Sequence, residues 1–321
     1  MDSAEQPVTV SVVTPSYNQG QYLAATIESV LAQEGDFRLD YLVIDGGSAD
    51  DSVEVIKRYE AMLNGGEWPV RCRDIRYRWV SEKDRGQSDA IVKGFGLAEG
   101  AVLAWLNSDD TYLAGALARV VEFFSKHPDT DLVYGKGHYI DVRGEIIGRY
   151  PAEPFDYGKL AMFNFICQPA AFFRKKAYDE VGGLDRGLRY TMDYELWIRL
   201  AATCRVGYLP EFLATYRLHE ESKTMAPADA AAFHEEVLKT TMKYYGWAPL
   251  NRVYGCCNTR VRAGMAGLAR FRALVVVVSL CYAVARYLVL NRGIRLDDVK
   301  MLTMRNLRKL SRDWSDLYKD Y

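Results

Sequence analysis

Residues 8–14 read Val-Thr-Val-Ser-Val-Val-Thr and are followed by Pro15-Ser16-Tyr17-Asn18. A valine-rich run that ends in a polar turn is typical of a buried strand with a loop after it. The same unit recurs along the first hundred residues. Apolar runs at 41–44, 77–80 and 101–106 alternate with amphipathic stretches at 21–33, 50–62 and 87–98. This alternation predicts βαβ units whose parallel strands form a sheet covered on both faces.

A polar cluster follows each of the predicted strands. These clusters are Ser16-Tyr17-Asn18, Asp45-Gly46-Gly47-Ser48, Glu82-Lys83-Asp84-Arg85-Gly86 and Asn107-Ser108-Asp109-Asp110. In open α/β sheets, ligands bind outside the carboxyl ends of the strands. The sequence therefore predicts an acidic, glycine-containing site at this edge of the sheet.

Beyond residue 130 the pattern is less regular. Short strands are predicted at 132–134, 170–173 and 213–216, with helices at 175–181 and 192–203. We expect this mixed second half to cover the edge at which the polar clusters meet.

The composition is that of a folded globular protein, with 49% hydrophobic and 26% charged residues in a chain of 321. The six cysteines include no CxxC pair, which argues against a zinc ribbon or a redox motif. The first residues lack the apolar run of a signal peptide, so we expect a cytosolic, reducing environment. Residues 252–321 contain 14 Lys and Arg against 5 Asp and Glu, whereas residues 1–251 contain 27 against 37. A basic tail on an acidic body suggests an anionic partner for the tail.

The common phosphate-binding and zinc-protease motifs are absent. Gly94-Phe95-Gly96 begins like GxGxxG, but its sixth position is Glu99 and the run falls inside a predicted helix. There is no Walker A sequence, and His219 and His234 each lack the second histidine of HExxH. A phosphate-rich ligand would therefore need another cation to balance its charge, and a metal ion is the obvious candidate.

Asn107-Ser108-Asp109-Asp110 contains the carboxylates that such an ion would need. Two adjacent acids at a strand end repel each other unless a cation lies between them, and hard oxygen ligands suit Mg²⁺ or Mn²⁺. The alternative is that one Asp caps a helix that begins near Tyr112.

Six motifs in this order resemble the family 2 glycosyltransferases of the GT-A fold. They are Val13-Thr14-Pro15-Ser16-Tyr17-Asn18, Asp45-Gly46-Gly47-Ser48 with Asp50, Glu82-Lys83-Asp84-Arg85-Gly86-Gln87-Ser88-Asp89-Ala90, Leu106-Asn107-Ser108-Asp109-Asp110, Met192-Asp193-Tyr194-Glu195-Leu196-Trp197 and Tyr216-Arg217-Leu218-His219. The resemblance covers roughly residues 8–220 and implies a Rossmann-like α/β fold that binds a nucleotide-sugar donor.

The resemblance assigns the donor to the strand ends. Tyr17 would offer a stacking face to the base, and Asp45 an acceptor for a base N–H. Two alternatives stay open: residues 45–48 also fit a turn capped by its own acid, and Lys93 fits either the diphosphate or a solvated helix face. The residues that the resemblance assigns to the donor are Pro15, Tyr17, Asn18, Asp45, Asp84, Gly86, Lys93, Asn107 and Asp109.

The resemblance also implies a metal ion and a catalytic base. Asp109, Asp110 and His219 would hold Mn²⁺ or Mg²⁺, although Asn107 departs from the Asp-x-Asp pattern that is usual in the family. Asp193 matches the base that takes the proton of the acceptor hydroxyl in an inverting, single-displacement transfer. Gln168 and Trp197 would face the acceptor. The processive Gln-x-x-Arg-Trp motif is absent, which indicates the addition of one or a few sugars.

The tail differs in composition from the rest. Residues 273–290 contain a single charge, Arg286, and are flanked by arginines. This length and the internal arginine favour an in-plane membrane helix with arginines at the headgroups over a span. A core helix or an oligomer interface is the alternative. Residues 301–321 are expected to form a second, amphipathic basic helix.

We therefore expect a GT-A domain at residues 1–225 and a helical, membrane-associating extension at 226–321. The expected function is metal-dependent, inverting transfer of a sugar from a nucleoside-diphosphate donor to a glycan or lipid-linked acceptor. We expect the protein on the cytoplasmic face of the cell membrane, attached peripherally or monotopically, without a nucleic-acid partner. The rival functions are an inactive membrane scaffold with the same fold and a sugar-phosphate nucleotidyltransferase.

Overall fold

The computed structural model describes residues 7–219, 230–265, 272–295 and 298. The predicted domain boundary at 225/226 and the helix predicted at 301–321 lie outside these residues. The chain divides into two compact units, which are described separately below. The first consists of Met1–Phe155 and Phe165–Arg217, and the second of Asp156–Asn164 and Leu218–Tyr321.

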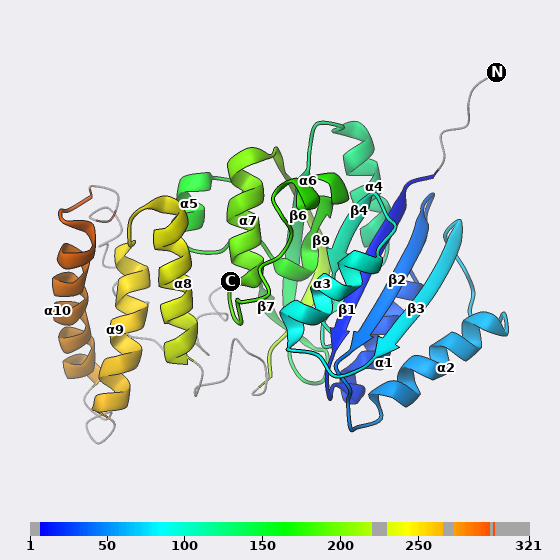
Figure 1. The fold of residues 1–321 in the computed structure, drawn as a ribbon, viewed down its shortest axis with the longest axis horizontal. Coiled ribbons are helices and arrows are strands. Elements are labelled where there is room, and N and C mark those ends of the chain that lie inside the picture. The colour runs from blue at the N-terminus through cyan, green and yellow to red at the C-terminus, as the bar shows by residue number, and fades with distance from the viewer. Residues whose placement is uncertain (1–6, 220–229, 266–271, 296–297, 299–321) are drawn as a thin grey trace. The chain divides into compact units, whose positions relative to one another are not determined.

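The first unit begins with the predicted βαβ repeats (Figure 1). Strands β1, β2, β3 and β4 are parallel and lie in the order β3-β2-β1-β4. The fold class is therefore confirmed as a Rossmann-like α/β sheet. The elements are β1 (Thr9–Ser16), α1 (Gly20–Leu31), β2 (Arg38–Asp45), α2 (Ser52–Asn64), β3 (Asp74–Ser81), α3 (Gln87–Leu97) and β4 (Val102–Trp105).

Beyond β4 the sheet is mixed, continuing in the order β8-β6-β9-β5, with β7 paired to β6. Strand β8 is antiparallel to β4 and to β6, while β9 is parallel to β6. The elements are β5 (Thr111–Tyr112), α4 (Ala116–Lys126), β6 (Leu132–Ile140), β7 (Ile146–Arg149), the 3-10 turn η1 (Gln168–Ala170), β8 (Ala171–Arg174), α6 (Lys175–Glu180), α7 (Met192–Thr203) and β9 (Val206–Arg217).

Helices cover both faces of the parallel strands, as the alternation of side chains along β1 shows. Val12 points into one core, which it shares with Ile27 of α1 and Ile56 of α2. Val13 points the other way, towards α3. A Cβ on Gly94 would lie 2.4 Å from Val13 Cγ1. Glycine at this position therefore lets α3 pack close to the sheet.

Two local expectations are corrected by the structure. Pro15 does not end β1 but lies within it, at a point where β1 pairs with β2 and no longer with β4. Its missing N–H therefore costs no ladder hydrogen bond. Tyr112 belongs to β5, and the next helix, α4, begins at Ala116, so neither Asp109 nor Asp110 caps a helix at Tyr112.

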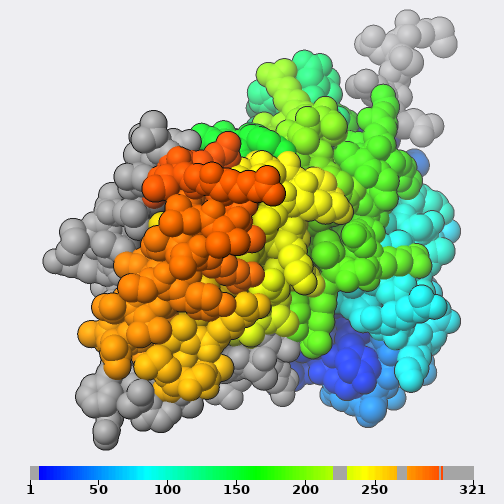
Figure 2. Space-filling view, turned by 60° about the vertical axis from the view of Figure 1, so that its left-hand side comes forward, coloured from blue at the N-terminus to red at the C-terminus, as the bar shows by residue number. Residues whose placement is uncertain are grey.

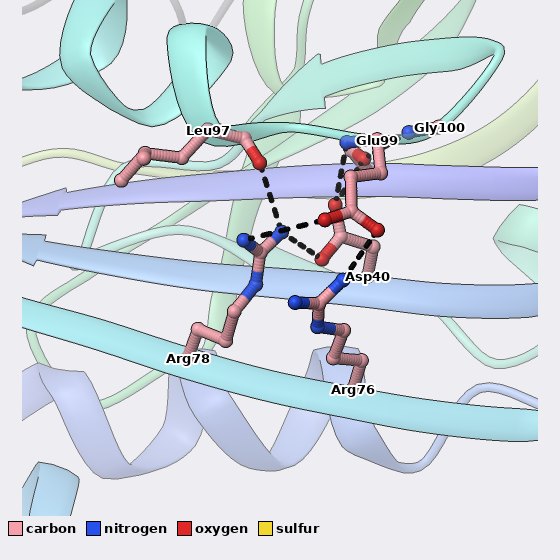
Figure 3. Close-up of polar contacts among 7 residues, drawn as sticks. Asp40, Arg76, Arg78, Leu97, Glu99 and Gly100 are labelled. Atoms are coloured by element: carbon pink, nitrogen blue, oxygen red, sulfur yellow. Dashed lines mark hydrogen bonds and ion pairs between the residues drawn. The ribbon is translucent and has the colours of Figure 1, made fainter.

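A buried carboxylate fixes the amino-terminal edge of the same sheet (Figure 3). Asp40 in β2 accepts hydrogen bonds from Arg78 Nη2 at 2.5 Å, Ser11 Oγ at 2.6 Å and the Glu99 backbone N–H at 3.0 Å. Arg76 is paired with Glu99 beside it. Because the four strands start here, this cluster holds their amino ends together.

The second unit contains the helices α5 (Tyr157–Met162), α8 (Ala230–Tyr245), α9 (Leu250–Gly264) and α10 (Arg272–Asn291). A small core joins α8, α9 and α10 through Leu238, Val253, Ala283 and Tyr287. Ala273–Asn291 has a mean hydropathy of 2.2 and is the one helix among the described residues that is long and apolar enough to cross a membrane. This property follows from the length and the composition of the helix alone.

Candidate active site

The loops that follow β1 and β2 are joined by hydrogen bonds. The Asn18 backbone N–H donates to Ser48 Oγ, and Asn18 Oδ1 accepts from the Ala49 N–H, both at 2.8 Å. Asn18 has a φ of 52°, a left-handed conformation that asparagine tolerates well. Tyr17 beside it is 61% exposed, so its ring is available for stacking. Pro15 is buried within β1, and its contact with a donor stays a prediction.

Asp45 is fully buried at the end of β2 and anchors its own turn. Its carboxylate accepts from Ser81 Oγ at 2.7 Å, from Ser48 Oγ at 2.5 Å and from the backbone N–H groups of Gly47 and Ser48 at 3.1 and 3.0 Å. These donors occupy both oxygens. The structure therefore shows the alternative that the sequence left open, a turn capped by its own acid, and the contact of Asp45 with a base stays a prediction.

Asp84 is a second carboxylate at this edge, and it is half-buried. Its Oδ1 accepts the Gly86 N–H at 2.8 Å, and its Oδ2 would lie 2.8 Å from a Cβ placed on Gly46. Glycine at position 46 thus leaves room for the Asp84 carboxylate above the turn. The motif at residues 45–48 predicts only a turn for Gly46, although a glycine directly after a strand-end acid also indicates a close approach of another group.

An amide network positions Asn107 at the end of β4. Asn107 Nδ2 donates to Gln168 Oε1 at 3.1 Å, and Asn107 Oδ1 accepts from Gln87 Nε2 at 2.7 Å. Gln168 Nε2 donates in turn to the Trp105 carbonyl at 2.8 Å. Gln168 is 7% exposed. Both the oxygen and the nitrogen of its amide form hydrogen bonds within the protein, and one of these bonds positions Asn107. Contact of Gln168 with an acceptor stays a prediction.

Asp110 is buried in the same turn with few compensating partners. Its Oδ1 accepts the Arg217 backbone N–H at 2.9 Å, and its Oδ2 accepts from Asn107 Nδ2 at 3.3 Å. Burial raises the pKa of Asp110 well above its usual value, and the neighbouring Asp109 carboxylate raises it further. A cation beside the pair would favour the ionised form of both acids. Their oxygen donors therefore fit a hard divalent ion.

Arg217 at the end of β9 holds the backbone of this turn. Its Nε donates to the Asp109 carbonyl at 2.9 Å and its Nη1 to the Asp141 carbonyl at 2.7 Å. The guanidinium also lies over the Tyr22 ring, 4.7 Å from its centroid, and the residue is only 6% exposed. No local pattern indicates a role for this arginine, because the partners of its guanidinium are 76 or more residues away along the chain.

Asp193 lies in the first turn of α7 and is half-buried. Burial raises the pKa of Tyr150, and the charge of Asp193 adds a smaller contribution in the same direction. Glu195 in the same turn is bound to Arg199, whose Nη groups donate to the carbonyls of Val181 and Gly183. Glu195 therefore serves a structural ion pair, and the assignment of Asp193 as the base stays a prediction.

Comparison with known proteins identifies the family. The sequence model described as "Glycosyl transferase family 2" matches residues 11–182, more than half of the chain. The chain belongs to glycosyltransferase family 2. A PGL/p-HBAD biosynthesis glycosyltransferase of Mycobacterium bovis (strain BCG / Pasteur 1173P2) is 32% identical over 191 residues, which are 59% of this chain and 68% of the relative. The protein is therefore a glycosyltransferase.

Solved structures share the GT-A fold at low sequence identity. S. aureus TarS 1–349 in complex with UDP-GlcNAc has a TM-score of 0.57 and 14% identity, over 79% of this chain and 72% of that one. The mannosyltransferase PcManGT of Pyrobaculum calidifontis, in complex with GDP-Man and Mn²⁺, has a TM-score of 0.57 and 15% identity, over 99% of this chain and 83% of that one. The resemblance to a GT-A glycosyltransferase is thus confirmed.

The structure also shows the surroundings of three other residues that the sequence assigned to the site of this glycosyltransferase. Trp197 is fully buried and stacks on Trp105 at 5.5 Å, so the prediction that it faces the acceptor is wrong. It is a core residue that fixes α7 against the sheet. Lys93 Nζ is paired with Glu82 Oε1 at 2.6 Å, and its contact with a diphosphate stays a prediction. His219 is 7% exposed and belongs to the second unit.

No group of three or more His, Cys, Asp and Glu side chains close enough to hold a metal ion occurs among the residues that the structure describes. The set Asp109, Asp110 and His219 therefore stays a prediction. What the first unit shows is the acidic pair alone, in the turn that Arg217 and Asn107 support.

Proposed function

We propose that this glycosyltransferase uses Mg²⁺ or Mn²⁺ to transfer a sugar, with inversion, from a nucleoside-diphosphate donor to an acceptor hydroxyl. The observation that carries the proposal is the acidic turn at the end of β4. There a buried carboxylate, Asp110, lies beside a second acid, and both burial and that neighbour raise its pKa. Such a pair needs a cation, which a metal bound together with a diphosphate would supply.

The two acids would have different tasks. Asp110 already accepts hydrogen bonds at both oxygens and would hold the shape of the turn. Asp109 is half-buried and would be the direct ligand of the ion, with His219 as a second ligand. A divalent ion bound there supplies positive charge that stabilises the leaving diphosphate. The PcManGT structure, which holds GDP-Man and Mn²⁺, supports this use of a metal.

The donor would lie along the ends of β1, β3 and β4. Tyr17 would stack on the base, because its ring is exposed. Asp84 would accept an N–H from the edge of the base, in the space that Gly46 leaves open. Asn107 Oδ1 would accept a hydrogen bond from a ribose hydroxyl. Asn18 and Gly86 would shape the two loops, as their hydrogen bonds to Ser48 and Asp84 suggest.

Asp193 would act as the base. The acceptor hydroxyl would give its proton to this carboxylate while its oxygen attacks the anomeric carbon and the nucleoside diphosphate leaves. One displacement inverts the configuration at that carbon. Asp193 lies in the first turn of α7, where the helix dipole interacts favourably with a carboxylate.

We further propose that residues 226–321 attach the GT-A domain, residues 1–225, to the cytoplasmic face of the cell membrane, where the acceptor would be a lipid-linked or surface glycan. The apolar helix α10 supports this location. The rival view, an oligomer interface formed by the C-terminal helices, makes a different prediction for the same helix and is tested below.

A donor screen tests the proposed chemistry. Full-length protein is incubated with a panel of UDP-, GDP- and TDP-sugars, with Mn²⁺, Mg²⁺ or excess EDTA, and nucleoside diphosphate release is measured. We expect release from one donor class, dependent on the metal. Full activity in EDTA would refute the metal role. Pyrophosphate release from a nucleoside triphosphate would identify a nucleotidyltransferase, and no turnover of any donor would favour the scaffold.

A further inference from the structure

The helix α10 has an outer side that is exposed and apolar. Its exposed residues recur at spacings of three and four, which places them on one side of the helix. Val277 is 57% and Val289 is 78% exposed. Figure 2 shows this side of α10, in orange, next to α9. The large apolar residues exposed on α10 are Leu274, Val277, Tyr282, Val284, Leu288 and Val289.

The opposite side of α10 is bound within the second unit. Ser279 Oγ donates to Asn258 Oδ1 of α9 at 3.2 Å. Asn291 exchanges two hydrogen bonds with the Ala248 backbone, at 2.8 and 3.0 Å. Ala283 and Tyr287 are buried in the small core. A helix that crossed the bilayer alone would have to break these contacts, so α10 is suited to lie half-submerged.

Arg286, the only charged residue between positions 273 and 291, does not reach the outer side. Its Nη2 lies 3.3 Å from both carboxylate oxygens of Glu235 in α8, and its side chain is 18% exposed. Arg286 also lies close enough to Cys257 of α9 to lower the pKa of that thiol, against the larger effect of burial. The internal charge is thus compensated inside the unit, and the outer side carries none.

The charged residues in the segment around α10 are all basic. Residues 237–296 contain ten Lys and Arg and no Asp or Glu. Two of the ten, Arg260 and Arg286, are paired with Glu235 of α8, at 3.0 and 3.3 Å. Two copies that packed through α10 would bring the remaining like charges together. An anionic lipid surface complements them, since each Lys or Arg near such a surface contributes about 1 kcal/mol.

We propose that the outer side of α10 is a membrane-binding surface that lies in the plane of an anionic bilayer. The apolar side chains would enter the boundary between headgroups and acyl chains, while the flanking arginines pair with lipid phosphates. This inference rests on the membrane attachment proposed above and specifies its surface and its mode. It does not depend on the transfer chemistry.

The first test compares two glutamate substitutions at sites of similar exposure. Val277→Glu places a charge on the outer side of α10, and Ile146→Glu, at a residue that is 61% exposed in β7, is the matched control. Full-length protein is sedimented with vesicles of phosphatidylcholine, with and without phosphatidylglycerol. We expect anionic vesicles to bind wild type and Ile146→Glu, and Val277→Glu to bind at least tenfold more weakly. Equal binding of the two variants would overturn the proposal.

A second test separates an in-plane helix from a span. Cys281 is exposed on α10, so it is replaced by Ser, together with Cys72 and Cys204, before new cysteines are added. Val277→Cys and Leu288→Cys are labelled with bimane and quenched by lipids that carry a spin label at known depths. The two sites are about 16 Å apart along the helix. Equal depths support the in-plane helix, and depths that differ by most of this distance refute it.

Two control measurements distinguish membrane binding from dimerisation and from a failure of the proposed chemistry. Light scattering without vesicles reports the oligomeric state: a wild-type dimer that Val277→Glu converts to monomer, with no vesicle binding, would assign α10 to a second copy. Donor turnover with a water-soluble acceptor is measured for the same variant. Retained turnover with lost vesicle binding supports the proposal, while absent turnover in wild type refutes the proposed chemistry and leaves the vesicle result standing.

Discussion

The two edges of the parallel sheet each bury a carboxylate, but they treat it differently. Asp40, at the amino-terminal edge, is 2% exposed and is compensated by a guanidinium, a hydroxyl and an N–H group (Figure 3). Asp110, at the carboxyl-terminal edge, is 1% exposed and accepts from two amide N–H groups. Burial and the neighbouring Asp109 raise the pKa of Asp110 more than the charge of Arg217 lowers it. The first arrangement stabilises the fold, whereas the second would be stabilised by the cation proposed above.

This difference indicates where stability and activity reside in the domain. Removing a buried charge that is fully compensated lowers the free energy of unfolding strongly, because its polar partners remain buried without it. A poorly compensated charge weakens the metal-free fold and strengthens the binding of a cation. Substitutions at the two edges should therefore separate the rate of sugar transfer from the free energy of unfolding.

The largest effect is expected for Asp193→Asn. The amide keeps the shape of the side chain but cannot take a proton, so kcat should fall by about 10²–10⁴ while donor binding is retained. Steady-state turnover and calorimetric titration of the donor measure the two quantities. Glu195→Gln is the control from the same turn, and it should lower thermal stability through its pair with Arg199 more than it lowers kcat. Near-normal turnover of Asp193→Asn would place the base elsewhere.

The second effect concerns the metal. Asp109→Asn should lower kcat by about 10²–10³ at saturating donor, because the transition state loses a charge-stabilising contact. The unfolding temperature of wild type should rise when Mn²⁺ and nucleoside diphosphate are added, and that of the variant should not. Asp129→Asn, at an exposed loop acid, is the control. An unchanged metal response in Asp109→Asn would exclude this residue as the ligand.

The third effect is one of stability at the opposite edge. Asp40→Asn should lower the free energy of unfolding by about 2–3 kcal/mol, less than for a fully buried pair because Arg78 is 25% exposed. Folded protein should retain the wild-type kcat. Urea denaturation and initial rates at low temperature measure the two. A large loss of kcat in folded protein would contradict the assignment of this edge to stability.

The smallest effect is expected for Asp110→Asn in metal-free protein. The asparagine oxygen can keep the bond from the Arg217 N–H, and the repulsion from Asp109 disappears. The free energy of unfolding should therefore change by less than about 1 kcal/mol. Urea denaturation in EDTA beside Asp40→Asn gives the comparison. If both substitutions were equally destabilising, the two buried acids would not differ in compensation as described.

Local patterns predicted most elements of the first unit. The strands and helices up to β4 appear within a few residues of their predicted positions, and α7 has its predicted bounds. Helix α4 begins at Ala116, four residues after the start near Tyr112 that the capping alternative gave. Asp156–Asn164 joins the second unit although it lies within the predicted GT-A domain. Such an exchange of segments between units leaves no trace in the periodicity of a sequence.

The sequence by itself determined the alternation of strands and helices, the polar cluster after each strand and the charge-free stretch in the tail. Each of these depends on residues that are neighbours along the chain. Only the tertiary structure decided which acids are compensated. The Asp45 carboxylate accepts a hydrogen bond from Ser81, Trp197 is stacked on Trp105, and Arg286 is paired with Glu235. These partners are distant in sequence, and the cost of a buried charge depends on what the fold places beside it.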